Sequence, residues 1–205
     1  MAFDAYMTFQ DPSGGFMKGE SQVKWSDTSP LAAGMNSDNV FEIDDFNFDL
    51  EQVVNIGSQS SGGGAGRVTF TPFTLNRKVD RASPTFMTMC CAGTHFKQVS
   101  LALRRAGAGA STTADAMTSG STFLRFDFAL VLVKTVSWSG SDGDEAMKEE
   151  LAFEYGAIKF SYLQQDFAGG GMTNAESMPI AQWNRVWNNN DYANFLKTYA
   201  VKGSS

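Results

Sequence analysis

Apolar and polar residues alternate along most of this chain, whereas the three-to-four spacing of an amphipathic helix is scarce. Alternation with a period of two places every second side chain on the same face of a β-strand. It predicts strands over residues 2–9, 18–25, 41–57, 67–78, 97–107, 122–138 and 150–162. The sequence therefore predicts a mainly β protein, and its length suits one domain with a sizeable core.

Two of these segments have features that a single regular strand does not explain. Residues 122–138 are long for one strand, so we expect a bend or break within them. The following apolar residues of that segment are expected to share one face: Leu124, Phe126, Phe128, Leu130, Leu132, Val136 and Trp138. In 150–162 the apolar positions change parity after Tyr155, which predicts a β-bulge at Gly156 and Ala157. Pro72 cannot donate to a ladder, so it is expected at a sheet edge or bulge.

One short helix is predicted over residues 84–92. Ser83 is a suitable N-cap, Pro84 suits the first helical position, and Gly93 fits just beyond the last turn. Side chains spaced by three and four residues would pack on the strands: Phe86, Met89 and Cys90.

The remaining segments are loops and a C-terminal tail. Residues 26–39, 57–66 and 106–121 are rich in small and polar residues, and long loops of this kind usually have a function. We expect one β domain over 1–165 and a C-terminal extension over 166–205, part of it helical. The extension should pack on that domain or on a neighbouring subunit, because its tryptophans would otherwise be exposed.

Charge and composition exclude several classes of partner. The chain has 16 Lys and Arg against 22 Asp and Glu, and no basic run, so nucleic acid is not expected to bind. The start MAFDAYMTF lacks the features of a signal peptide, so the chain is expected to be made in the cytoplasm. Arg125, Asp127 and Lys134 interrupt the most apolar segment, so no membrane span is predicted.

Both cysteines and the one histidine fall within residues 78–96, which raises the question of a reaction centre. A Cys/His pair needs the base within hydrogen-bond reach of the thiolate and a group that orients the base. Neighbouring helical side chains diverge by about 100°, and His95 lies beyond Gly93. We therefore interpret Cys90 or Cys91 as a small buried apolar residue. The spacing also lacks the paired ligands of a structural zinc site.

Two further patterns partly match known ligand-binding motifs. Residues 45–49 have the D-x-N-x-D start of a calcium loop, but Leu50 stands where Gly is needed and Ile56 where Glu belongs. The run GGGAGR, 62–67, has no following Lys-Ser/Thr to hold a phosphate. The first is interpreted as the polar face of a strand and the second as a loop. We predict no catalytic, cofactor-binding or metal-binding residues and no cofactor.

Several segments resemble the haemolysin-coregulated protein family, the tube subunit of type VI secretion systems. The similar segments, in order, are MAFDAYM (1–7), KGES (18–21), FTLNRKVDRASP (73–84), CAGTHFKQVSLALRRAG (91–107) and EELAFEYGAIKFSY (149–162). The resemblance implies a small β-barrel of two packed antiparallel sheets with one short flanking α-helix, about 84–92.

The same resemblance implies a structural function without catalysis. Such subunits form six-membered rings that stack into a tube, which has a spike protein at its tip, a contractile sheath around it and effectors in its lumen. Export by that machine would explain secretion without a signal peptide, and the loop 26–40 would contact the next ring. The alternatives are a tube subunit of a related phage-like contractile injection system and a ligand-binding β-barrel.

The sequence also departs from the family pattern. Arg104 stands where the family commonly has Cys, and family chains usually end near Gln165. The departure leaves the role of residues 166–205 open.

Overall fold

The structure is a computed structural model that describes residues 3–27, 29–54, 65–105, 121–143, 146–164 and 178–200. Most of the predicted loops 57–66 and 106–121 lie outside these residues. The strands are β1 (Phe3–Gln10), β2 (Phe41–Ile43), β3 (Asp45–Asn47), β4 (Leu50–Val54), β5 (Ala65–Phe70), β6 (Phe73–Lys78), β7 (His95–Arg105), β8 (Ser121–Ser139), β9 (Lys148–Tyr162) and β10 (Ile180–Asn184). The helices are η1 (Pro30–Ala32), α1 (Ser83–Ala92) and α2 (Tyr192–Ala200).

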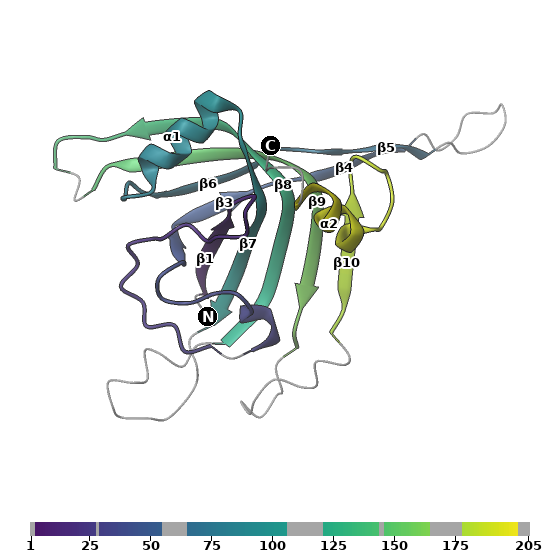
Figure 1. Cartoon of the computed structure of the whole chain (residues 1–205), viewed down its shortest axis with the longest axis horizontal. Coiled ribbons are helices and arrows are strands. Elements are labelled where there is room, and N and C mark those ends of the chain that lie inside the picture. Colours follow the sequence, from purple (N-terminus) through teal and green to yellow (C-terminus); the bar gives the residue numbers. More distant parts are fainter. Residues whose placement is uncertain are drawn as a thin grey trace.

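Eight strands form one antiparallel sheet that nearly closes on itself. Their order is β2-β1-β7-β8-β9-β6-β3, and β10 pairs with β9 beside this path. The two end strands, β2 and β3, are consecutive in the chain and separated only by Asp44, whose N–H donates to the Asn76 carbonyl at 2.9 Å. The chain itself thus joins the two ends of the sheet, and the predicted mainly β barrel is confirmed (Figure 1).

The second sheet contains only β4 and β5, which form a separate antiparallel pair. We call this pair, Leu50–Val54 with Ala65–Phe70, the arm. It projects away from the barrel, as Figure 1 shows.

A cluster of phenylalanines fills the barrel. The ring of Phe9 on β1 lies 4.9–5.8 Å from four other rings, each on a different element: Phe41, Phe86, Phe96 and Phe153. All five are essentially inaccessible to solvent. Because Phe86 belongs to α1, the helix seals the barrel as a flanking element, and burial of such rings is a major contribution to stability.

The ends of α1 agree with the prediction within one residue, but one capping assignment was wrong. Gly93 has a left-handed φ of 64° and its N–H donates to the Met89 carbonyl, as expected of a C-terminal glycine. The N-cap is Ala82, without a side-chain cap. The Ser83 hydroxyl instead accepts hydrogen bonds from the Asp80 N–H and from Arg77. Phe86 is buried, and Met89 and Cys90 pack at the edge of the core as predicted.

Three predicted strands differ in the structure. Residues 18–25 form no strand; their backbone lies beside the loop that precedes β2, where the Trp25 N–H donates to the Ser37 hydroxyl at 2.8 Å. The segment 41–57 is divided at Asp44 and at 48–49 into β2, β3 and β4. The segment 67–78 is divided at Thr71 and Pro72, so Pro72 lies between two strands and not at an edge or bulge.

The parity change in β9 is confirmed, but the predicted bulge at Gly156 and Ala157 is wrong. Tyr155 and Ile158 both face the core, yet the β8–β9 register continues unbroken through this level, with Ala129 opposite Ala157 and Val131 opposite Tyr155. The two strands change faces together. On β8 the change occurs at Leu130, which has a left-handed φ of 51°.

This change also corrects the predicted face of β8. After Leu130 the core residues are Val131 and Val133, while Leu132 and Trp138 are exposed. Leu130 itself packs against the C-terminal helix. The expected irregularity within this long strand is confirmed by Leu130 and by a register shift between Val133 and Thr135.

Candidate functional site

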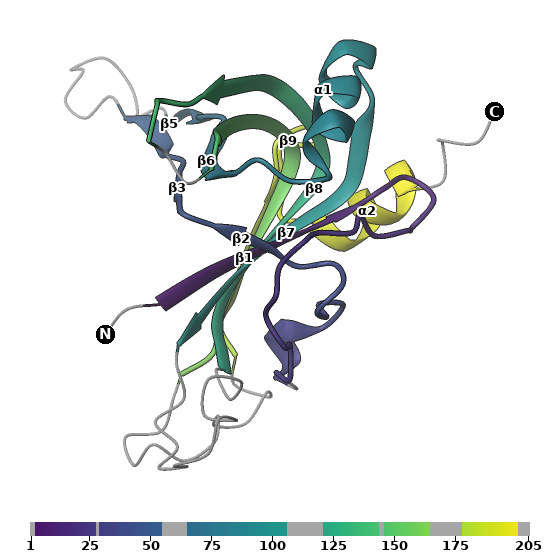
Figure 2. The ribbon, with the colours of Figure 1, turned by 90° about the vertical axis from the view of Figure 1, so that its left-hand side faces the viewer.

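The outer face of the main sheet, opposite the phenylalanine core, is covered by two segments. The first is the loop around η1, from which Met35 and Val40 pack on Tyr6 and Ala102. The second is α2, which packs over β8 and β9. Figure 2 shows both segments on the same side of these strands. The loop 26–40 and the C-terminal segment are thus part of one surface layer.

α2 packs closely because the strands beneath it have small residues. Phe195 is fully buried and contacts Ala129 and Ala157, together with Tyr192 from the same helix. Gly156 lies directly under the Phe195 ring. The C-terminal extension is partly helical, as predicted, and its helix α2 packs on the chain's own sheet.

A buried carboxylate lies between the two covering segments. Asp127 on β8 accepts hydrogen bonds at one oxygen from the Ser100 hydroxyl (2.6 Å) and the Gln98 amide (2.9 Å). Arg125 contacts the same oxygen at 2.7 Å, and Lys159 contacts the other at 3.0 Å. The side chain of Asp127 is only 1% exposed, so its charge depends on these partners.

This network connects both covering segments to the sheet. The Arg125 guanidinium also donates to the carbonyls of Leu31 and Ala33 in the loop, at 2.9 and 2.7 Å. The Lys159 ammonium lies 5.5 Å from the centre of the Tyr192 ring of α2. Asp127 is the shared acceptor, and we call Asp127, Arg125, Lys159 and Ser100 the outer-face network.

The electrostatics of this network follow from burial and from the two cations. Burial opposes ionisation of Asp127, but Arg125, Lys159 and the Ser100 hydrogen bond outweigh it and lower the pKa of the carboxyl. The pKa of the Tyr192 phenol is raised, mainly by burial and further by Asp127. Asp127 is therefore charged and Tyr192 neutral near neutral pH.

A second buried network fixes the start of α1. Arg77 donates to Glu149 at 2.7 Å, to Asp80 at 2.7 Å and to the Ser83 hydroxyl at 3.0 Å. Trp138 donates its indole N–H to the other oxygen of Glu149 at 2.9 Å. Arg77 and Glu149 are both almost completely buried, so the pair joins β6, β9 and the helix within the core.

An apolar groove of about 610 Å³ lies between the arm and β10. No ionisable side chain lines it, and the arm contributes four of its lining residues and β10 three. The full lining is Phe48, Leu50, Gln52, Val68, Phe70, Phe126, Ile158, Phe160, Ala181, Gln182 and Trp183. An open apolar groove of this kind is typical of contact with another protein surface.

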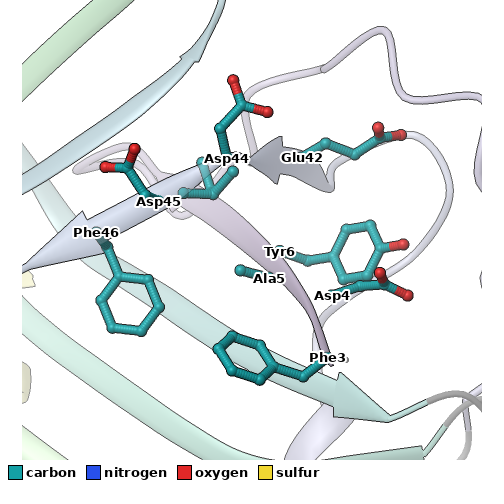
Figure 3. A pocket seen from close by; sticks show the side chains of 9 residues that line it. Phe3, Asp4, Ala5, Tyr6, Glu42, Asp44, Asp45 and Phe46 are labelled. Carbon is teal, nitrogen blue, oxygen red and sulfur yellow. The ribbon is translucent and has the colours of Figure 1, made fainter. Parts of the chain in front are cut away.

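A second pocket, of about 490 Å³, lies where β1, β2 and β3 meet. Its acidic residues are Asp4, Glu42, Asp44 and Asp45. Figure 3 shows the Phe3 and Phe46 rings on one side of the pocket and the carboxylates of Glu42 and Asp44 pointing away from them. Within the described ranges, no three His, Cys, Asp or Glu residues are arranged to hold a metal ion.

The residues considered for chemistry are dispersed. Cys90 is half-buried with its sulfur 3.8 Å from the Lys134 carbonyl oxygen, and Cys91 is exposed. His95 begins β7 and pairs with Leu132. Asp45 and Asn47 lie on β3, where Asp45 accepts a hydrogen bond from Asn76, so the interpretation as the polar face of a strand is confirmed. No helix in the described part of the chain is long and apolar enough to cross a membrane.

Sequence reasoning missed the outer-face network. The signal was present, since Arg125 and Asp127 are two residues apart on one face of an apolar strand. Their alternation with apolar positions places both on the outer face of β8, but nothing within the strand shows that this face is covered. A buried ion pair in that position needs a cover on the outer face of the sheet, and the loop and α2 provide it.

Comparison with known proteins identifies what this architecture is similar to. A family model described as "Type VI secretion system effector, Hcp" matches residues 6–162. The curated protein hcp1 of Pseudomonas aeruginosa is 28% identical over 103 residues, which are 50% of this chain and 58% of that protein. The matched part thus spans little more than half the length of that relative.

Solved structures show the same fold. One titled as the structure of a type six secretion system protein has a TM-score of 0.67 and 20% identity, covering 93% of this chain and all of its own. Hcp1 from Salmonella typhimurium has a TM-score of 0.59 and 21% identity, with the same coverages. Hcp1 from E. coli EAEC 042 has a TM-score of 0.64 and 15% identity, covering 90% of this chain and 99% of its own.

These coverages bear on the C-terminal segment. The structural match covers 93% of this chain, which is a larger share than residues 1–165 make up. The match therefore extends into residues 166–205. The family match itself ends at residue 162, so the role of residues 166–205 stays a prediction.

Proposed function

This chain belongs to the Hcp family of type VI secretion proteins, and we propose that it assembles as six-membered rings that stack into the inner tube. The observation that carries the proposal is the family match over 6–162, which spans the barrel from within β1 to the end of β9. It includes both the buried Arg77 network and the outer-face network.

Two strand edges and the apolar groove between them are suited to a contact between copies of the chain. In the described part of the chain, β9 is the only strand paired with β10, and β5 is the only strand paired with β4. Apart from the bridge between Asn184 and Asn189 at the end of β10, each thus has an edge available to another strand. The apolar groove lies between these edges, and Leu50 and Ile180 beside it are more than half exposed. A head-to-tail contact closes into a ring when its rotation divides a full turn, and stacking then needs complementary ring faces.

The loop 26–40 remains our proposed contact between rings, with a restriction from the structure. Leu31 and Met35 are buried against the subunit's own sheet, whereas Ala33 and Asp38 are exposed. Deleting residues 28–38 would uncover the sheet as well as remove the contact. The exposed positions are a cleaner test: Asp38→Arg should leave rings intact and prevent stacking. Long tubes formed by this variant would contradict the assignment.

The remaining parts of the proposal concern partners and location. We propose that a spike protein binds at the tube tip, that a contractile sheath surrounds the tube, and that effectors travel in its lumen. We further propose that the chain is made in the cytoplasm, exported by the type VI machine, and acts without catalysis, cofactor, nucleic acid or membrane contact. The division into a barrel, 1–165, and an extension, 166–205, is part of this proposal.

Light scattering on the gel-filtered protein, with negative-stain images of the peak, tests the assembly. Six copies of the 22.2 kDa chain give a mass of about 133 kDa, and ring views should accompany it. A monomer of 22.2 kDa at high concentration would contradict the proposal and favour the ligand-binding alternative. Rings whose tube assembles with components of a phage-like system would instead favour the related injection machine.

A further inference from the structure

The orientation of the arm relative to the barrel is not set by main-chain pairing. Among the described residues, no ladder joins β4 or β5 to the main sheet. The arm meets the barrel at Asp49 and Thr71, where the Thr71 N–H donates to the Asp49 carbonyl at 3.0 Å. The arm continues the paired strands β3 and β6, with only residues 48–49 and 71–72 between them, so a change in its angle to the barrel is confined to this junction. Side-chain contacts across the junction restrain that angle further.

Arg185 makes the contact best placed to fix that angle. Its guanidinium carbon lies 5.0 Å from the centre of the Phe70 ring on the arm and 4.9 Å from the centre of the Tyr155 ring on β9. The two rings are themselves edge to face at 6.2 Å. A planar cation in contact with both rings joins the arm to the barrel and disfavours changes in the angle between them.

The barrel side of this contact is firmly held. The Arg185 guanidinium donates to the Tyr155 carbonyl at 2.8 Å and to Glu154 at 3.3 Å, and its backbone N–H donates to the Gly156 carbonyl at 2.8 Å. The preceding residue, Asn184, is fully buried and its side-chain oxygen accepts the N–H groups of Val186 and Trp187, both at 2.9 Å. Arg185 is therefore positioned by the turn after β10 and not by the arm.

We propose that Arg185 is a positioning residue that fixes the orientation of the β4–β5 arm on the barrel. The segment after β9 thereby controls an element that lies far from it in the sequence. One consequence rests on the proposed function: if the arm contacts a neighbouring copy, the C-terminal segment determines the geometry of that contact.

The test measures the arm angle directly by pulsed electron spin resonance. Spin labels at Glu51→Cys on the arm and Met147→Cys on the barrel, both exposed positions, report the distance between them in a Cys90→Ala, Cys91→Ser background. Dilution with unlabelled protein restricts the signal to pairs within one chain, whatever the assembly state. The full chain should give one narrow distance distribution.

Arg185→Ala should broaden that distribution about twofold, as expected when a hinge loses its restraint. Arg185→Lys should broaden it less, because it keeps the charge but loses the planar contact with the rings. Lys134→Ala is the matched control, since Lys134 pairs with the other oxygen of Glu154 at 3.2 Å without contacting the arm. An unchanged distribution in a folded Arg185→Ala protein would overturn the proposal.

A second variant decides the matter if Arg185→Ala does not fold. Phe70→Leu removes the arm's ring and leaves Arg185 and Tyr155 in place, and it should broaden the distribution in the same way. Light scattering on the same samples separates this inference from the proposed function. A monomeric wild-type protein with the expected broadening contradicts only the ring assembly. Hexameric proteins with identical distributions contradict only the role of Arg185.

Discussion

The Phe195 ring of α2 lies so close to Gly156 of β9 that no side chain fits between them. A Cβ at Gly156 would be 2.7 Å from Cζ of Phe195 and 3.3 Å from Cβ of Leu130. The Phe195 side chain cannot move aside, because it is fully buried between two other aromatic rings. Its ring centre lies 4.6 Å from that of Tyr199 and 5.2 Å from that of Trp187. The glycine is thus required by the docking of the helix.

Gly156→Ala should therefore destabilise the protein by about 1–3 kcal/mol, the usual cost of overpacking a buried site. Urea unfolding measures the loss, and protease cleavage near α2 should become faster. Gly140→Ala is the control, since its Cβ would be 3.6 Å from the Met147 side chain, which is ordinary contact. A Gly156→Ala protein as stable as the Gly140→Ala protein would show that α2 does not depend on this contact.

Low pH should weaken the attachment of the loop 26–40 and of α2 to the main sheet, because protonation of Asp127 removes the charge at the centre of the outer-face network. Its pKa in the folded protein is lowered, so its contribution to stability is present above the ordinary aspartate value of about 3.9. The contribution decreases as the pH falls through that value towards the lowered pKa. The free energy of unfolding, measured from about pH 6 to about pH 3, should show this loss.

Asp127→Asn is the control for this titration. The variant should be less stable by about 3 kcal/mol near neutral pH, because Arg125 and Lys159 lose a buried charged partner. Its stability should then fall less on acidification, so the two curves converge. Parallel curves would mean that other carboxyl groups account for the acid sensitivity.

The buried Arg77–Glu149 pair predicts a non-additive response to mutation. Glu149→Gln should cost about 3 kcal/mol, because it leaves Arg77 buried with one carboxylate partner, Asp80. Replacing both members, Arg77→Met with Glu149→Leu, should cost less than the sum of the single changes, since no unpaired charge remains.

Denaturant unfolding of the single and double variants gives this coupling energy. The exposed pair Lys134–Glu154 serves as the reference, and Lys134→Ala there should change stability by less than about 1 kcal/mol. Additive costs at Arg77 and Glu149 would show that the two side chains act independently.

Cys90→Ala and His95→Ala should each change stability by about 1–2 kcal/mol and leave assembly intact. Cys90 packs at the edge of the core and His95 is half-buried at the start of β7, so both changes remove packing contacts. Thermal unfolding and light scattering measure the two effects. Loss of an enzymatic activity in either variant, with folding intact, would contradict a purely structural function.

The features that could be predicted from sequence depend on near neighbours in the chain. Gly93 ends α1 because the local backbone requires a left-handed conformation there, which glycine adopts readily. Val99, Leu101 and Leu103 face the core because they alternate with other residues within one strand. The parity change in β9 was visible for the same reason.

The features that could not be predicted depend on residues distant in the chain. Leu130 adopts a left-handed conformation at the level where its partner strand also changes faces, so the true face of β8 cannot be derived from β8 alone. Arg185 has no sequence pattern that connects it with Phe70. Its position beside the arm results from the pairing of β10 with β9.

The pairing of β1 with β7 has a consequence for how the chain is synthesised. β1 pairs along its whole length with β7, from Phe3 opposite Arg105 to Gln10 opposite Gln98, and its other neighbour, β2, has only three residues. The apolar side chains of Met7 and Phe9 therefore leave the ribosome long before their main partner exists. Pairings this distant in sequence form slowly, and a nascent chain with an unpaired apolar strand is prone to aggregate. Chaperones that shield β1 until β7 has been made should therefore raise the yield of this protein.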